Sequence, residues 1–442
     1  MQIRLSEHFT FRKLIRFTLP SIAMMIFTSV YSVVDGFFVS AFVGKTSFAA
    51  VNFIMHYLIM LGAVGAMLGT GGSALIAKRL GEKREKEANE FFSLLIYTLL
   101  TVGAVLAAIS IILAEPVARL LGGEGELLRL AVLYARINFI ALPAWMLQYA
   151  FQSLFVTAEK PHLGLVFTIG AGLTNILLDG VLVGLLKLGV AGAAMATGLS
   201  QTVGGFIPLL FFFRKNSSLL RLGKARIDVR ALLKACSNGS SEFLSNISMS
   251  VVGMLYNAQL LKYAGEDGIA AYGVMMYVGF IFVAVFLGYS VGSAPIVGFH
   301  FGAGNCDELK NLRRKSLTLM ISASVVMMLA SLLLSAPMSR LFVGYDSGLY
   351  EMTVRGFIIF SFSFLFSGIP IYASSFFTAL NDGITSAAIS FLRTLVFQTA
   401  AILIFPLFWE LDGIWFSLVA AEIAAAAVGA ILLIAKRKRY GY

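Results

Sequence analysis

The sequence predicts an all-α polytopic membrane protein with twelve transmembrane helices in two six-helix lobes. Hydrophobic residues make up 59% of its 442 residues and charged residues only 13%, about half the charged fraction of an average soluble protein. Twelve apolar runs reach the length of about twenty residues that a helix needs to cross a hydrocarbon core of about 30 Å. The first half of the chain also resembles the second half at a constant offset.

The apolar runs give the expected helices in chain order. We expect spans at residues 14–42, 47–77, 91–114, 131–157, 162–186, 189–213, 232–263, 267–301, 316–338, 353–379, 384–408 and 413–435.

Basic residues between the spans set their direction across the membrane. With the N-terminus inside, the inner segments hold 25 of the 34 Lys and Arg residues, and the outer loops hold seven. The inner segments are the N-terminal stretch, the loops at 78–86, 160 and 310–315, the linker region 214–234 and the tail 436–439. Because positively charged loops stay in the cytoplasm, a plasma (cytoplasmic) membrane protein with both termini cytoplasmic is predicted.

The two halves align without a gap at a shift of 221 residues. At this shift Gly81 meets Gly302 and Glu87 meets Glu308, and Gly44 meets Gly265. Six helices separate the copies, so the two lobes run in the same direction around an axis along the membrane normal, as in transporters with parallel repeats. We expect an N-lobe at 1–213, a basic cytoplasmic linker at 214–231 and a C-lobe at 232–442.

The composition also excludes several classes of protein. The only cysteines are Cys236 and Cys306, too few for a disulfide framework or a four-thiolate metal site. The net charge of +11 lies at the ends of apolar segments, where it sets topology, so no nucleic-acid partner is expected. No ATP-binding motif is present, since Gly44-Lys45-Thr46 lacks the earlier glycine of a P-loop, Val39 standing there instead. We therefore expect neither an enzyme nor an ATP-driven pump.

Several ionisable residues fall within the predicted spans, where each costs several kcal/mol. Asp35 lies ~28 Å along the first helix from Arg16, and Asp179 lies ~27 Å along the fifth. Thr197 lies ~13 Å down the sixth helix from the outer side, so all three reach one level in the outer half of the membrane.

Two further polar residues share helical faces with these acids. Asn175 precedes Asp179 by four residues, and Tyr31 precedes Asp35 by four. Two neighbouring carboxylates in a partly dry place repel each other, so they either share a proton or recruit a cation. The cluster is therefore interpreted as a proton or Na⁺ site; structural hydrogen bonding between helices is the alternative. Apart from a possible Na⁺ at Asp35 and Asp179, no metal or cofactor is expected.

The repeat serves as an internal control for this cluster. At the same shift Asp35 becomes Tyr256, Asp179 becomes Ala400, Asn175 becomes Val396 and Thr197 becomes Leu418. The polar set therefore occurs in one half only, which favours a specialised role over general helix packing.

Other charged residues in the spans allow two interpretations. Glu242, in the seventh helix, is either a second protonatable or substrate-contacting group, or the cap of a kink after Ser237–Ser241. For Arg136, Arg393 and Glu422 we favour structural roles, such as pairing with a neighbouring charge.

Several segments resemble multidrug and toxic compound extrusion (MATE) transporters along essentially the whole chain. They are Asp35-Gly36-Phe37-Phe38-Val39, Asn175–Asp179, Gly189–Thr197, Ala270–Gly273 and Pro295–Ala303. The resemblance implies two lobes in a V shape around a central cavity and export of bulky organic cations driven by inward H⁺ or Na⁺. It also implies a cation site at Asp35, Asn175, Asp179 and Thr197. Glu242 comes earlier in its helix than the acid of some family members.

The sequence thus predicts a cation-coupled antiporter for amphipathic, cationic organic compounds, acting as a monomer in the lipid bilayer. The alternative is a flippase for lipid-linked saccharides or lipids. Anionic diphosphate lipids call for several cationic side chains in the cavity, whereas away from their ends the spans offer only Arg136 and Arg393.

Overall fold

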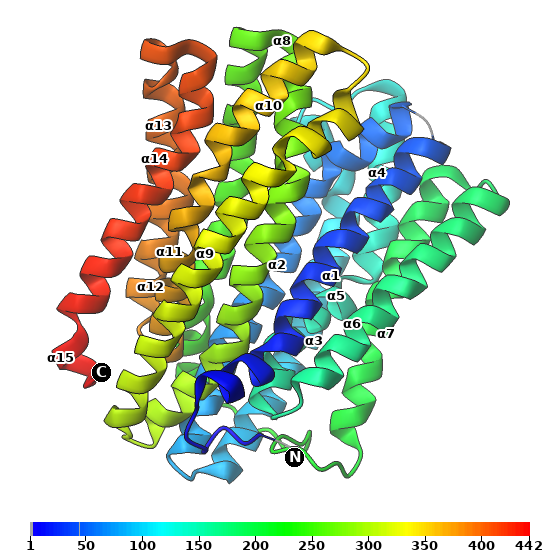
Figure 1. Ribbon diagram of the computed structural model, residues 1–442. Helices are drawn as coiled ribbons and strands as arrows, with labels where there is room; N and C mark the ends of the chain where they lie inside the picture. The colour runs from blue at the N-terminus through cyan, green and yellow to red at the C-terminus, as the bar shows by residue number, and fades with distance from the viewer. Residues whose placement is uncertain (1–2, 44) are drawn as a thin grey trace.

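The computed structural model describes residues 3–43 and 45–442, and most of these residues are helical. In the first half the elements are α1 (Phe11–Val43), α2 (Lys45–Gly81), α3 (Glu85–Leu120), α4 (Gly125–Ile140), α5 (Leu142–Thr157), α6 (Pro161–Leu178), the π-helix η1 (Asp179–Leu185) and α7 (Gly189–Phe213). In the second half they are α8 (Val229–Gly302), α9 (Cys306–Val343), α10 (Ser347–Ser361), α11 (Ser363–Ala379), α12 (Gly383–Phe391), the π-helix η2 (Leu392–Phe397), α13 (Gln398–Ile404), α14 (Pro406–Ala435) and α15 (Arg437–Tyr440). Figure 1 shows them as one bundle of long, roughly parallel rods.

The helix α8 is the key to the number of membrane spans. Its 74 residues would rise ~110 Å as one rod, far more than a bilayer of ~40 Å including its interfaces. The chain instead turns back at Gly265, which has φ 62° and ψ −150°, a conformation that suits glycine because it has no Cβ. Gly44, which the repeat aligns with Gly265, lies outside the described residues.

With this reversal, the twelve predicted spans are confirmed. Among the described residues, nine continuous segments are long and apolar enough to cross a membrane, and α8 is one of them. The pairs α4–α5 and α10–α11 supply one bent span each, with angles of 62° and 43°. Counting α8 twice gives twelve spans in a multi-pass membrane protein.

The helices extend beyond several of the predicted ends. The span predicted from 316 begins at Cys306, and the span predicted from 131 begins at Gly125. The added turns carry charged residues such as Lys310 and Arg313. A helix keeps its backbone hydrogen bonds after it leaves the hydrocarbon, so an apolar run marks the membrane-embedded part better than the helix end.

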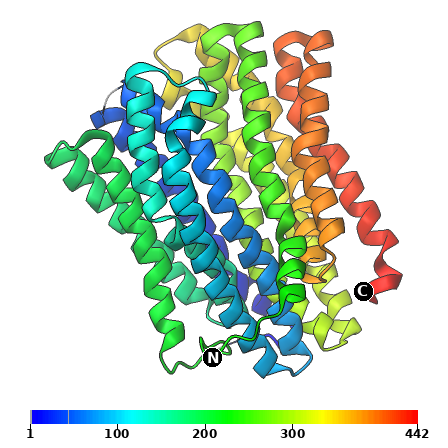
Figure 2. The same ribbon diagram turned by 180° about the vertical axis from the view of Figure 1, so that it is seen from behind.

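The side chains pack into two hydrophobic cores. One joins α2 to α7, from Ala50 to Phe212, with the start of α8. The other joins α8 to α14 and also takes in Leu5, Phe9, Leu14 and Phe17 from the N-terminal segment. The start of the chain therefore packs with the second half. Figure 2 shows both termini at the same end of the bundle.

The two halves meet closely between α2 and the first part of α8. A Cβ on Gly71 would lie 1.9 Å from the carbonyl oxygen of Ala235, and a Cβ on Gly239 would lie 1.8 Å from that of Met67. No side chain fits at such distances, so glycine at both positions allows the two backbones to touch.

Candidate cation site

Asp35 and Asn175 come together because α1 packs tightly on α6. A Cβ on Gly172 of α6 would lie 2.5 Å from the Phe27 ring of α1, so glycine lets the helices approach. One to two turns further along, the Asn175 amide Nδ2 donates a hydrogen bond of 3.4 Å to Asp35 Oδ1. The contact joins residues 140 positions apart and orients the Asp35 carboxylate toward α6.

Asp179 lies where α6 ends and the π-helix η1 begins. Its side chain is completely buried, and neither carboxylate oxygen has a hydrogen-bond partner. η1 packs against α1 and α7, and the Asp179 carboxyl lies within hydrogen-bond reach of the Asp35 carboxyl. Two ionised carboxylates have no hydrogen to share, so a pair this close is stable only with a shared proton or a bound cation.

Thr197 on α7 and Asn175 add two more oxygens without partners. Thr197 Oγ1 and Asn175 Oδ1 are both buried and accept no hydrogen bond. Buried polar atoms are nearly always satisfied in native proteins, so each exception needs an explanation. Asn175 lies at Asp35, and Thr197 lies beside Tyr134, which is within electrostatic range of both aspartates. Carboxylate, amide and hydroxyl oxygens are the ligands that hard cations prefer.

Tyr31 lies one turn before Asp35 on α1, within electrostatic range of its carboxylate. Its ring packs against Phe27, with the ring centroids 5.9 Å apart. Of the six candidate cation-site residues, Asp35, Asn175, Asp179 and Tyr31 thus lie together, and Thr197 lies beside a tyrosine that is within electrostatic range of both acids.

Glu242 is the residue that lies apart. It belongs to the first part of α8, and its backbone carbonyl accepts a hydrogen bond of 2.8 Å from Asn246 Nδ2. In the described ranges 3–43 and 45–442, no hydrogen bond or ion pair reaches its carboxylate from another side chain.

The sequence analysis missed two neighbours of the acid pair. The buried Tyr134 phenol of α4 lies beside Thr197 and Asn138, within electrostatic range of both aspartates. Gln201, one turn after Thr197, has a buried Oε1 without a partner. Both could have been found from their spacing: four helices of the first half each carry two polar residues four positions apart, namely Tyr31/Asp35, Tyr134/Asn138, Asn175/Asp179 and Thr197/Gln201.

Comparison with known families gives a match in both halves. The MatE family model matches residues 20–181 and 243–404. The chain belongs to the MatE family. Its curated relatives include the multidrug export protein MepA of Staphylococcus haemolyticus, 24% identical over 98% of this chain and 95% of the relative. MepA of Staphylococcus aureus (strain MRSA252) is 23% identical over 94% and 92% of the two chains.

Solved structures of MATE transporters share the fold of this MatE chain. An outward-facing multidrug resistance MATE family transporter aligns with a TM-score of 0.92, at 22% identity and over 98% of this chain and 97% of the other. A MATE transporter in complex with MaL6 aligns with a TM-score of 0.93, at 21% identity and over 98% of each chain.

In the second half of this MatE chain, the positions that the repeat aligns with the candidate cation site carry different side chains and different contacts. Tyr256, aligned with Asp35, forms a hydrogen bond of 2.8 Å with Ser417. Beside it, Arg393 Nε donates bonds of 3.0 Å to both oxygens of Glu422, whose side chain is 3% exposed. Glu422 occupies the position aligned with Gln201. In the second half, the guanidinium of Arg393 thus neutralises the buried acid, whereas in the first half the carboxylate of Asp179 has no hydrogen-bond partner.

Arg136 of α4 has a local partner near the surface of the helix bundle. Its Nε donates a hydrogen bond of 3.3 Å to the carbonyl oxygen of Ile111, and its guanidinium lies 3.9 Å from the carboxylate of Glu115. Both intramembrane arginines are therefore engaged by neighbouring helices.

Proposed function

We propose that this MatE protein is a cation-coupled secondary transporter that exports amphipathic, cationic organic compounds. Asp35 and Asp179 are its coupling pair, and Asn175, Thr197 and Tyr31 are their partners. The supporting observation is the buried Asp179 carboxylate, which has no donor and lies beside a second carboxylate. Multidrug export is the activity named for its MepA relatives.

The chemistry of the pair suggests how coupling would work. With both carboxylates ionised and no ion bound, their mutual repulsion favours separation of α1 from α6 and η1. A proton shared between them, or Na⁺ held by the oxygens of Asp35, Asp179, Asn175 and Thr197, removes that repulsion. An ion that binds one arrangement better shifts the population toward it. We propose that the loaded pair favours the state that releases cargo outside.

Cargo transport tests this function directly. Purified protein in proteoliposomes is given a fluorescent organic cation under separate pH and Na⁺ gradients. Wild type should transport under one of the gradients, which names the coupling ion. Asp35→Asn and Asp179→Asn should abolish gradient-driven transport, whereas Glu351→Gln, at an exposed site, should not. Equal transport by Asp35→Asn and wild type would contradict the coupling role.

The lipid flippase is the less favoured function. Recognition of a diphosphate calls for free cationic side chains, but Arg393 is bound by Glu422 and Arg136 by Glu115 and Ile111. Absence of organic-cation transport under either gradient would favour the flippase.

A further inference from the structure

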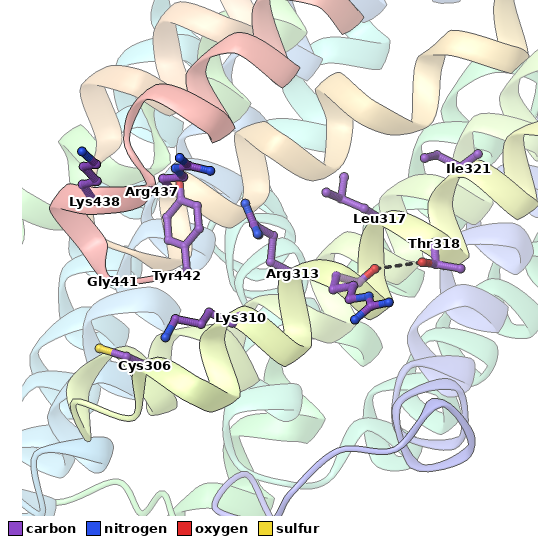
Figure 3. A pocket seen from close by; sticks show the side chains of 11 residues that line it. Cys306, Lys310, Arg313, Leu317, Thr318, Ile321, Arg437, Lys438, Gly441 and Tyr442 are labelled. Carbon is purple, nitrogen blue, oxygen red and sulfur yellow. Dashed lines mark hydrogen bonds between the residues drawn. The ribbon is translucent and has the colours of Figure 1, made fainter.

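A cavity of about 900 Å³ opens beside the C-terminal segment, at the end of the bundle where both termini lie. One wall is the first turns of α9, and the other is α15 with Gly441 and Tyr442. Five basic residues line it: Lys310, Arg313, Arg314, Arg437 and Lys438. No acidic residue is among the lining residues. Figure 3 shows Lys310 and Arg313 on α9, with Arg437 and Lys438 on the neighbouring α15.

These cations are largely free of partners. Within the described parts of the chain, Lys310 pairs with Asp307 at 3.2 Å, and no acid pairs with the other four. The nearby Asp382 is engaged by Lys436 at 2.7 Å, so it does not neutralise Arg437. Such a concentration of positive charge attracts anions to this space.

Arg313 is held in place without using its hydrogen-bonding capacity. Its guanidinium stacks over the Tyr442 ring at 5.3 Å from the centroid. Its Nε is buried and has no hydrogen-bond partner. A planar guanidinium fixed by an aromatic ring, with donors to spare, suits recognition of phosphate oxygens.

The cavity continues into an apolar surface along α9. Lys310, Arg313 or Arg314, Leu317 and Ile321 follow one another at helical spacing on one face. Ile321 is 48% exposed, and beyond it Val325 and Leu329 continue the exposed apolar side. In a membrane-spanning helix such a face contacts lipid chains. The site is therefore basic at the membrane surface and apolar toward the bilayer interior, which is the polarity of a phospholipid.

We propose that this cavity binds the headgroup of an anionic phospholipid, with an acyl chain along Leu317 and Ile321 of α9. Basic pockets between transmembrane helices bind such headgroups in other membrane proteins, and five cations suit two phosphates better than one. The site lies outside the candidate cation site and does not depend on the coupling proposal. It would anchor the C-terminal segment to α9 through a bound lipid.

Binding is measured by native mass spectrometry on the full-length protein in detergent. The probes are tetraoleoyl cardiolipin, dioleoyl phosphatidylglycerol, dioleoyl phosphatidylcholine and inorganic pyrophosphate. Cardiolipin should bind most tightly and phosphatidylcholine most weakly. Arg314→Gln/Lys438→Gln should weaken cardiolipin binding about 25-fold, since each cation near the surface is worth about fivefold in affinity. Leu317→Ala/Ile321→Ala should weaken binding of both anionic lipids and leave pyrophosphate binding unchanged.

A matched control separates a built site from general surface charge. Lys215→Gln/Lys224→Gln removes the same charge from exposed linker positions and should leave lipid binding unchanged. Equal weakening by the control and the cavity variant would overturn the proposal. Binding of pyrophosphate as tight as that of cardiolipin would replace it with a soluble-anion site, and equal affinity for phosphatidylcholine and phosphatidylglycerol would also overturn it. Thermal unfolding of each variant checks that the fold is kept.

Discussion

Gly81 and Gly302 form a reciprocal contact between the two halves of the molecule. A Cβ on Gly81 would lie 2.0 Å from the carbonyl oxygen of Phe299, and a Cβ on Gly302 would lie 2.0 Å from that of Lys78. The shift of 221 residues that relates Gly81 to Gly302 also relates Lys78 to Phe299. The local two-fold axis of the repeat therefore passes between α2 and the second part of α8, where the backbones touch.

Adding a methyl group at either glycine should push the two halves apart. Gly81→Ala and Gly302→Ala should each lower the free energy of unfolding by about 1–3 kcal/mol, the usual cost of overpacking. The two effects should be nearly equal because the contact is reciprocal. Thermal unfolding of the purified variants in detergent measures both.

Gly253→Ala is the matched control for these substitutions. It lies in α8 with no atom within 4 Å of the added Cβ, so it should be neutral or slightly stabilising, as alanine favours a helix. A large loss at Gly302 with none at Gly81 would contradict the reciprocal packing.

Much of this fold could be predicted because each membrane span requires a long apolar run, which is visible in the sequence. Apolar length gave the twelve spans, and the repeat gave the alignment of Gly81 with Gly302. That both glycines are contact points could not be predicted, because alignment identifies equivalent positions but not which of them face each other. The π-helices η1 and η2 could not be predicted either, because they lie inside continuous apolar runs.

The candidate site could be predicted in part for a similar reason. Depth along straight helices placed Asp35, Asp179 and Thr197 at one level. In the structure Asp35 lies with Asn175 and Asp179, and Thr197 lies beside Tyr134, which is within range of both acids. Tyr134 was missed because the depth argument began with charged residues. The partner of Arg393 could not be predicted, since the choice of Glu422 depends on the rotation of α14 relative to η2.

Removal of the Tyr134 hydroxyl should weaken ion binding at the acid pair. Tyr134→Phe deletes a phenol beside Thr197, within range of both carboxylates. A hydroxyl at this place can donate to a site oxygen when the ion is bound, and its loss should raise the coupling-ion concentration at half-maximal transport about tenfold, which corresponds to a hydrogen bond of about 1.4 kcal/mol. Transport rate against Na⁺ or H⁺ concentration measures this shift.

The control for this substitution is Tyr345→Phe, whose side chain is 83% exposed and should leave the ion dependence unchanged. An unchanged ion dependence in Tyr134→Phe, with the fold kept, would place the phenol outside the ion site.

Asp382 should stabilise the C-terminal segment in a pH-dependent way. Burial disfavours its charged form, but hydrogen bonds from Lys436, Thr385 and Tyr440 outweigh burial and lower the pKa of Asp382 from 3.8 to about 2. A lowered pKa stabilises the folded state above pH 3.8, and the contribution is lost as the pH falls toward 2. Asp382→Asn should therefore cost about 2 kcal/mol at neutral pH.

The pH dependence distinguishes this electrostatic effect from a packing defect. The difference in unfolding temperature between wild type and Asp382→Asn should be constant from pH 7 to about pH 5 and shrink from about pH 4 downward. A difference that stays the same at pH 3 would show that the substitution acts through packing instead.

The ion pair of Arg393 and Glu422 should be structural, in contrast to the acid pair of the first half. Arg393→Met leaves a buried carboxylate without a counter-charge, which should cost about 3–5 kcal/mol of stability. Replacement of both residues, in Arg393→Met/Glu422→Leu, removes the charge together with its partner and should restore most of the loss. Thermal unfolding of Arg393→Met, Glu422→Leu and the double variant gives the coupling energy between the two residues.

Transport by the double variant then tests whether ion coupling depends on the first half alone. The guanidinium of Arg393 already neutralises Glu422, so Glu422 does not require a transported ion as its counter-charge. The double variant should keep the ion dependence of wild type, whereas Asp35→Asn should lose it. If the folded double variant loses ion coupling, then the second half takes part in coupling, and Arg393 acts there as an exchangeable counter-charge for Glu422.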